Sequence, residues 1–248
     1  MLLKIGTYNI CHCADFEGWE TGEALKVDVE KTARTIKNLQ LDVIGLNEVY
    51  SEGEKEEYIK QTERLASLAG YDYCAFAVGE KFSWTTIGNS VLSRYPIIKL
   101  DSIVVEKPSE EERAIENASY WEDRVILVAD VNVNGCVIKV IQSHFGLNLI
   151  EQKNIVRKVC EVIDESEYPV VLMGDFNVLP DNEVLSDIYS RLLSVTKETK
   201  QTMLTFSSYK PEKQIDYIFV SRSMEIKSCT VYDIVVSDHR PLTAEIVL

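Results

Sequence analysis

The chain has 248 residues, of which 46% are hydrophobic and 27% charged, and its formal net charge is −14. These values are typical of a folded protein with a sizeable core, and we expect one domain over residues 1–248. Because no long Lys/Arg run offsets the negative charge, the composition weakens a general affinity for nucleic acid without excluding a locally positive cleft.

The start of the chain leads directly into a strand-like segment and lacks the charged, apolar and small-residue order of a signal peptide. No apolar run approaches the roughly 18 to 20 residues that span a bilayer. Six cysteines are scattered through a chain too large to need disulfides for stability, as expected for reduced thiols. We therefore expect a cytoplasmic, monomeric protein with no membrane partner.

Apolar periodicity predicts the elements in chain order. Short apolar, β-branched runs predict strands at 2–10, 42–49, 124–132, 136–144, 169–174, 215–221 and 242–248. Helical spacing predicts helices around 29–36, 58–69 and 156–163. Residues 106–121 carry a Pro, four consecutive charges and little periodicity, which predicts a long surface loop. Helices separate strands in two places only, so we expect mixed, mainly antiparallel sheets with helices outside them.

Polar side chains close or interrupt several of these apolar strands. They are Asn9, Glu48, His144, Asp175, Asn177 and Asp216, and the pair Asp238-His239 follows in a loop that Pro241 ends. Any one of them alone is better explained as a strand end that turns into solvent. Together they indicate a site, because carboxylates at the rim of a core need a metal or a hydrogen-bonding cation.

Oxygen-rich sites of Glu, Asp and Asn suit Mg²⁺ or Mn²⁺, which bind few carboxylates and leave room for water and phosphate oxygens. This pattern predicts phosphoryl transfer to water. The run Cys11-His12-Cys13 offers zinc ligands as an alternative, but it lacks the paired spacing of structural zinc motifs.

Seven short strings along nearly the whole chain carry a family resemblance. They are Thr7-Tyr8-Asn9-Ile10, Leu46-Asn47-Glu48-Val49, the segment 88–97 with Asn89, Gln142-Ser143-His144-Phe145, Gly174-Asp175-Phe176-Asn177, Gln214-Ile215-Asp216-Tyr217-Ile218 and Ser237-Asp238-His239. In this order the chain resembles the endonuclease/exonuclease/phosphatase superfamily, which includes deoxyribonuclease I, as a small bacterial-type member. The resemblance implies a four-layer α/β/β/α sandwich with the site at one edge.

The resemblance also implies roles. Glu48 would bind the catalytic metal, with Asn9 as a ligand or orienting amide and Asp238 at or near the ion. Asp175 would position or deprotonate the attacking water, and Asn177 would hold the water and the phosphate. His239 would donate to phosphate oxygens, with Asp216 fixing the tautomer of its ring.

Two further assignments rest on the deoxyribonuclease-like branch of that superfamily. Glu122 can be matched with His144 as a second acid and histidine pair that faces the phosphate. The alternative is that Glu122 is simply an acidic residue of a loop. Asn89 is a candidate for substrate binding, or simply a turn residue. The chain departs from common family patterns at Gln214, where many relatives have Arg, and at Cys13, where many small bacterial members have Gly. These differences leave the substrate open.

We therefore expect a Mg²⁺- or Mn²⁺-dependent phosphoesterase that acts on a phosphodiester or phosphomonoester of a small phosphorylated metabolite. The alternatives are a metal-dependent nuclease acting on DNA or RNA and a catalytically silent binding module. The residues that the site requires are all present, which argues against the silent module. We expect the substrate to be selected by rim segments 14–25, 82–87 and 106–121.

Overall fold

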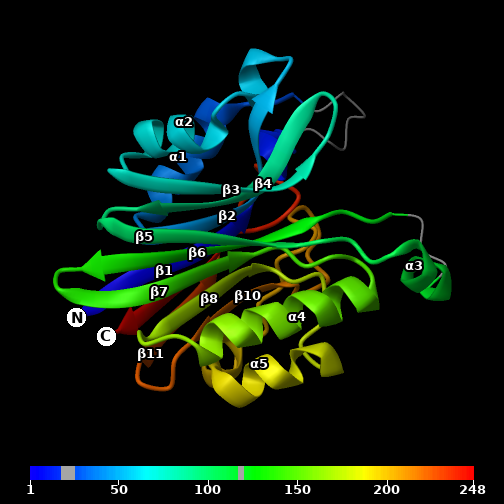
Figure 1. Cartoon of the computed structure of the whole chain (residues 1–248). Helices are drawn as coiled ribbons and strands as arrows, with labels where there is room; N and C mark the ends of the chain where they lie inside the picture. Colours follow the sequence, from blue (N-terminus) through cyan, green and yellow to red (C-terminus); the bar gives the residue numbers. More distant parts are fainter. Residues whose placement is uncertain (18–25, 117–119) are drawn as a thin grey trace.

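The computed structural model describes residues 1–17, 26–116 and 120–248 and forms four layers (Figure 1). Two six-stranded sheets pack face to face, and helices cover their outer faces. One sheet has the order β11-β12-β1-β2-β4-β3 and the other β5-β6-β7-β8-β10-β9. This arrangement confirms the expected α/β/β/α sandwich of mixed, mainly antiparallel sheets.

The first sheet contains β1 (Leu2–Asn9), β2 (Val43–Gly53), β3 (Tyr73–Lys81), β4 (Thr85–Ser93), β11 (Glu225–Val231) and β12 (Leu242–Val247). The second contains β5 (Ile97–Val105), β6 (Arg124–Val133), β7 (Cys136–Ser143), β8 (Val170–Asp175), β9 (Leu193–Ser194) and β10 (Asp216–Val220). Helices α1 (Val29–Leu39) and α2 (Gln61–Ala69) lie by the first sheet. Helices α4 (Leu149–Asp164) and α5 (Ser186–Arg191) lie by the second, and α6 spans Val195–Glu198.

Successive side chains of the central strands point to opposite faces of their sheet, and they build three apolar layers: one between the two sheets and one between each sheet and its helices. In β6, Leu127 enters the core between the sheets, whereas its neighbour Ile126 enters the core beneath α4. In β1, Ile5 likewise faces the other sheet and Tyr8 faces α1. Successive strand residues point to opposite faces, so strands covered on both sides are apolar throughout and read as continuous hydrophobic runs.

Each sheet contains one parallel strand pair, and these pairs position the site. Strands β1 and β2 are connected through α1, and β7 and β8 through α4. The carboxyl ends of β1 and β8, Asn9 and Asp175, come within hydrogen-bonding distance of each other across the two sheets. The two strand-helix-strand units therefore deliver their terminal polar residues to the same edge of the sandwich.

The prediction of a loop over 106–121 was wrong in its central part, where α3 spans Glu110–Glu116. A reciprocal capping box starts this helix: the Glu112 backbone N–H donates to Ser109 Oγ, and the Ser109 N–H donates to the Glu112 carboxylate. The sequence Ser-Glu-Glu-Glu carried this signal, which the charge run concealed. Residues 117–119 of the predicted loop lie outside the described residues.

Two other predictions need adjustment. Strand β2 does not end at Val49, as predicted, but continues to Gly53, and a register shift between Leu46 and Val49 places a bulge at Asn47 and Glu48. Strands β3, β4, β5, β9 and β11 were not among the predicted strands. In the described part of the chain, no helix is long and apolar enough to cross a membrane.

Candidate active site

The centre of the site is a contact between polar residues of both sheets. The Asn9 side-chain amide donates to Glu48 Oε1 at 2.9 Å and to Asp175 Oδ2 at 3.2 Å. Glu48 has a left-handed backbone with φ of 56° because it lies in the β2 bulge. Bulges redirect side chains beside active sites, and here the bulge turns a carboxylate toward the neighbouring strand end. Burial, and next the negative charge of Asp238, raise the pKa of Glu48.

A fully buried amide, Asn47, ties the two sheets together beneath these residues. Its Nδ2 donates to Asn89 Oδ1 at 2.8 Å and to the Ser143 carbonyl at 3.1 Å, and its Oδ1 accepts from the Asp175 N–H at 2.9 Å. Asn47 therefore fixes the position of the Asp175 backbone relative to β2. Sequence reasoning included Asn47 in a motif but gave it no role.

We expect Asn47→Ala to lower the free energy of unfolding by about 1–3 kcal/mol, because it leaves buried partners unsatisfied. Urea denaturation followed by circular dichroism measures this loss. Asn38→Ala on the exposed face of α1 is the matched control and should change stability by less than about 0.5 kcal/mol. Equal stability of the two variants would contradict the structural role of Asn47.

His239 lies between two buried carboxylates. Its Nδ1 is 2.8 Å from Asp216 Oδ2, and its Nε2 is 3.5 Å from Asp175 Oδ2. Burial lowers the pKa of His239, but the charges of Asp216 and Asp175 outweigh this and raise it to about 10. Burial also raises the pKa of Asp175, against the opposing charge of His239. His239 is therefore an imidazolium at neutral pH. Its Nδ1 is hydrogen-bonded to Asp216, its Nε2 faces Asp175 at ion-pair distance, and one ligand atom from each of the three residues lies within 4.8 Å of the other two.

The second histidine, His144, is held differently. Its Nδ1 is 3.3 Å from the Arg124 guanidinium and its Nε2 is 3.2 Å from the Asn177 NH₂ group, so a donor faces each ring nitrogen. That Nε2 lies 3.5 Å from Asp175 Oδ2. Burial, and next the positive charge of Arg124, lower the pKa of His144. The site therefore holds one charged and one neutral imidazole on either side of Asp175.

The matched acid of His144, Glu122, reaches it only through Arg124. Glu122 Oε2 forms a 3.1 Å ion pair with Arg124, and Glu122 Oε1 accepts a short hydrogen bond from the Tyr120 hydroxyl. The expected acid and histidine pair is thus a chain of three residues, Glu122, Arg124 and His144. Arg124 opens strand β6 and had no predicted role, because a strand-initial arginine looks like an ordinary surface charge.

The two predicted amides Asn177 and Asn89 have different surroundings. The Asn177 side chain donates to the Phe145 carbonyl at 3.0 Å and lies 3.2 Å from His144 Nε2, while its N–H donates to Asp175 Oδ1. Asn89 is buried, donates to the Val125 carbonyl at 2.7 Å and accepts from Asn47. Both polar ends of Asn89 are therefore engaged within the protein, where they join Asn47 to β6.

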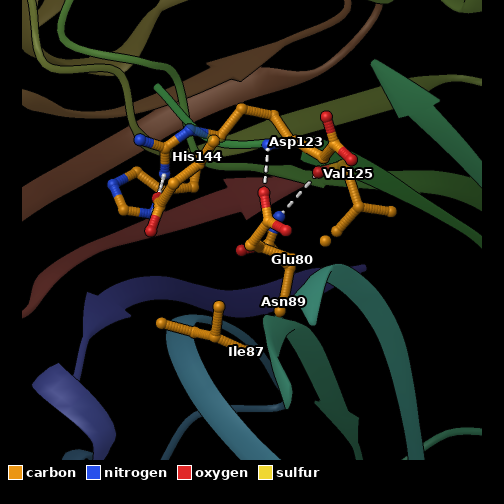
Figure 2. A pocket seen from close by; sticks show the side chains of 10 residues that line it. Glu80, Ile87, Asn89, Asp123, Val125 and His144 are labelled. Carbon is orange, nitrogen blue, oxygen red and sulfur yellow. Dashed lines mark hydrogen bonds and ion pairs between the residues drawn. The ribbon is translucent and has the colours of Figure 1, made fainter. Parts of the chain in front are cut away.

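A small gap behind His144 is lined by Asn89 and Arg124 (Figure 2). Asn89 reaches across it toward Val125, and the Glu80 carboxylate accepts from the Asp123 N–H at 2.9 Å. Its volume of about 20 Å³ has room for one water molecule. This gap is too small for a substrate.

The larger cavity opens directly above Asp175 and has a volume of about 470 Å³. It brings together Glu48, Glu122, His144, Asp175, Asn177, Asp238 and His239, together with Arg124 and Lys213. Asn9 and Asp216 do not line the cavity but contact residues that do: Asn9 is hydrogen-bonded to Asp175, and Asp216 to His239. An open cavity of this size with convergent polar groups is the usual form of a small-molecule site.

The predicted rim contributes unevenly to this cavity. Of segment 82–87 only Ile87 lines it, and of segment 106–121 only Tyr120 does among the described residues. The greater part of segment 14–25, residues 18–25, lies outside the described residues. Further lining comes from Leu147 and Leu179, in the loops after β7 and β8, and from Phe206 and Lys213, in the segment between α6 and β10; none of the four belongs to a motif.

Comparisons with known proteins agree with this geometry. The sequence model of the Endonuclease/Exonuclease/phosphatase family matches residues 6–239. A search of curated proteins found no match. Among solved structures, an endonuclease/exonuclease/phosphatase from Beutenbergia cavernae DSM 12333 has a TM-score of 0.78 at 22% identity, covering 100% of this chain and 72% of that one.

Two further structures superpose over almost their whole length. A family protein from Leptotrichia buccalis C-1013-b has a TM-score of 0.73 at 23% identity and covers 99% of this chain and 100% of its own. A mannosyl-6-phosphatase from Bacteroides thetaiotaomicron VPI-5482 has a TM-score of 0.74 at 17% identity, with the same coverage. The family match spans more than nine-tenths of the sequence, and this chain therefore belongs to the endonuclease/exonuclease/phosphatase family.

Proposed function

We propose that this protein is a Mg²⁺- or Mn²⁺-dependent phosphoesterase that hydrolyses a small phosphorylated metabolite. Members of its family hydrolyse phosphoester bonds. The observation that carries the proposal is the position of Asp175: it lies between a charged and a neutral imidazole, beside Glu48, at the floor of an open cavity.

The acidic side chains fit a divalent ion. Glu48 and Asp238 present hard carboxylate oxygens to the same cavity, and their negative charges repel one another. Such a pair is the ligand type that Mg²⁺ prefers, with waters and phosphate oxygens completing the shell. Asn9 fits as an orienting amide, because its NH₂ group donates to the carboxylates of Glu48 and Asp175 while its oxygen accepts from the Cys11 N–H. When bound, the ion would neutralise charge on the phosphate oxygens.

The protein's own groups account for the remaining chemistry. Asp175 has a raised pKa and is therefore a stronger base than an exposed carboxylate, so it accepts the proton of the attacking water. The new bond joins the water oxygen to phosphorus, and the bond from phosphorus to the leaving oxygen breaks. Imidazolium His239 donates to a phosphate oxygen, with Asp216 fixing its ring. The neutral ring of His144 lines the cavity beside Asp175, and the Asn177 side chain holds it in place.

The cavity favours a small substrate over a nucleic-acid strand. Besides the His239 imidazolium, which is held by Asp216 and Asp175, its lining cations are Arg124, which is paired with Glu122, and Lys213. Leu147 and Leu179 are 59% and 48% exposed at its edge. A protein binds a nucleic-acid strand through a row of cationic side chains that displaces the counterions of the phosphates. This chain has a net charge of −14 and few cations among the described residues that line the cavity, so these offer no such row there. The similar mannosyl-6-phosphatase supports a phosphomonoester of a small sugar-like molecule as one candidate.

A substrate panel with Mg²⁺ or Mn²⁺ tests this function. It comprises sugar phosphates, nucleotides, cyclic phosphodiesters, chromogenic mono- and diesters, and DNA and RNA oligonucleotides. We expect metal-dependent product release from at least one small ester. Absence of turnover on every member would reject the proposal, and oligonucleotide cleavage that falls steeply with salt would identify a nuclease instead.

Glu48→Gln should raise the Mg²⁺ or Mn²⁺ concentration that gives half-maximal activity by at least about tenfold, because an amide replaces the charged ligand. Activity measured against metal concentration gives this value. Glu245→Gln on β12 is the matched control, since its carboxylate pairs with Lys4 on the outside of the sheet and should leave metal dependence unchanged. An unaltered metal requirement in Glu48→Gln would contradict the assignment.

A further inference from the structure

Two side chains beside Glu48 have no task in the proposed reaction. Cys11 and His12 follow β1 directly, in a short 3₁₀ turn, Cys11–Cys13. One ligand atom each from Cys11, His12 and Glu48 lies within 4.8 Å of the other two. All three side chains are half-buried, so solvent ions can reach them.

The His12 ring is held in place by stacking, while its two nitrogens have no hydrogen-bond partner among the described residues. It stacks on Tyr50 with ring centroids 4.6 Å apart and an interplanar angle of 9°. The Gln61 amide donates to the His12 carbonyl at 2.9 Å and accepts from the Tyr50 N–H at 2.9 Å, which ties the turn to β2. Within the described residues, neither the His12 ring nitrogens nor Cys11 Sγ form a hydrogen bond. The His12 ring is thus oriented by stacking, and its nitrogens and Cys11 Sγ are available to bind a metal ion.

The backbone of the turn is unusual in the same place. Cys11, His12 and Cys13 all adopt left-handed conformations, with φ of 41°, 48° and 65°. Residues with a Cβ are strained there, and such strain persists where the surroundings hold it, often at ligand sites. The Asn9 side chain contributes to this hold, because its Oδ1 accepts from the Cys11 N–H at 3.1 Å.

We propose that Cys11, His12 and Glu48 form a site for a borderline-soft divalent metal of the Zn²⁺ class, distinct in chemistry from the oxygen-donor site. Sulfur, nitrogen and one carboxylate oxygen are the ligands that Zn²⁺ and Co²⁺ prefer over Mg²⁺. Metal binding forms the metal–sulfur bond as the thiol of Cys11 releases its proton to solvent. No electron transfer is involved.

Metal binding at this site requires only a small movement of the three ligand atoms toward one another. Tetrahedral zinc with bonds of about 2.0–2.3 Å holds its ligand atoms about 3.5 Å apart. The three atoms therefore approach by about 1 Å, which half-buried side chains can do by rotation. Burial, and next the negative charges of Glu48 and Asp238, raise the pKa of the Cys11 thiol, and the same two carboxylates favour a cation beside it. Because the site uses Glu48, Zn²⁺ there competes with Mg²⁺ for that carboxylate.

Titration of the whole metal-free chain with Co²⁺ tests this site without any activity assay. We expect a near-ultraviolet thiolate-to-cobalt charge-transfer band that saturates at one equivalent and disappears when Zn²⁺ is added. The band should be lost in Cys11→Ser and weakened at least about tenfold in apparent affinity in His12→Asn. Cys74→Ser removes an exposed thiol on β3 and should keep the band.

Thermal unfolding of each metal-free variant shows whether it is folded, and His12→Asn provides a second reading if Cys11→Ser is not. The absence of a thiolate band in the wild-type chain would overturn the proposal. So would a band that persists in folded Cys11→Ser or that depends on Cys74. The proposal concerns cation binding alone and does not rest on the phosphoesterase activity, so either can fail without the other.

Discussion

Asp175→Asn should reduce turnover by about 10²- to 10⁴-fold, the range that a positioned general base contributes. The substitution keeps the shape of the side chain and its capacity to accept from the Asn177 N–H, but the amide cannot take a proton from water. It also removes the negative charge that His239 and His144 both face at 3.5 Å. The measurement is kcat on the best small ester of the substrate panel, at saturating Mg²⁺ or Mn²⁺.

The control for this variant is Asp164→Asn, the same chemical change at an exposed carboxylate that pairs with Arg191 near the end of α4. It should retain activity within about twofold, because surface ion pairs contribute little. Circular dichroism should show that both variants are folded. If folded Asp175→Asn kept wild-type turnover, another group would have to be the base.

Gly174→Ala should lower the free energy of unfolding by more than about 4 kcal/mol, which only severe packing or backbone conflicts produce. Gly174 has a φ of +146°, and a Cβ built on it would lie 1.8 Å from the backbone oxygen of Ser143 on the parallel neighbour β7. Neither backbone can move aside without breaking the pairing of β7 and β8. Urea denaturation, or loss of soluble protein if the variant does not fold, gives the result.

Gly70→Ala separates the effect of crowding from that of the left-handed backbone alone. Gly70 ends α2 with a φ of +81°, and a Cβ there would meet no atom within 4 Å. We expect a loss of only about 1–2 kcal/mol, the usual cost of that conformation for a residue with a Cβ. A Gly174→Ala variant no less stable than Gly70→Ala would show that β7 and β8 are not so closely packed.

Much of the fold could be predicted because its signals are local. Continuous apolar runs marked the central strands such as β6 and β8, and helical spacing marked α1 and α4. The edge strands were harder to predict: β5 and β11 are largely exposed, so their sequences lack the apolar pattern of a buried strand. The helix α3 was missed because its capping box overlaps a charge run.

The sequence by itself determined which polar residues end or interrupt the buried strands, and hence the donor types of the site. Tertiary structure alone decided their partners. Arg124 lies between Glu122 and His144. The Asn47 side-chain amide forms hydrogen bonds with β4 of its own sheet and with β7 and β8 of the other sheet. Such contacts join residues up to 128 positions apart, and only the stacking of two sheets brings their strand ends together. Local patterns encode which face a side chain takes, but they carry no information about what it meets there.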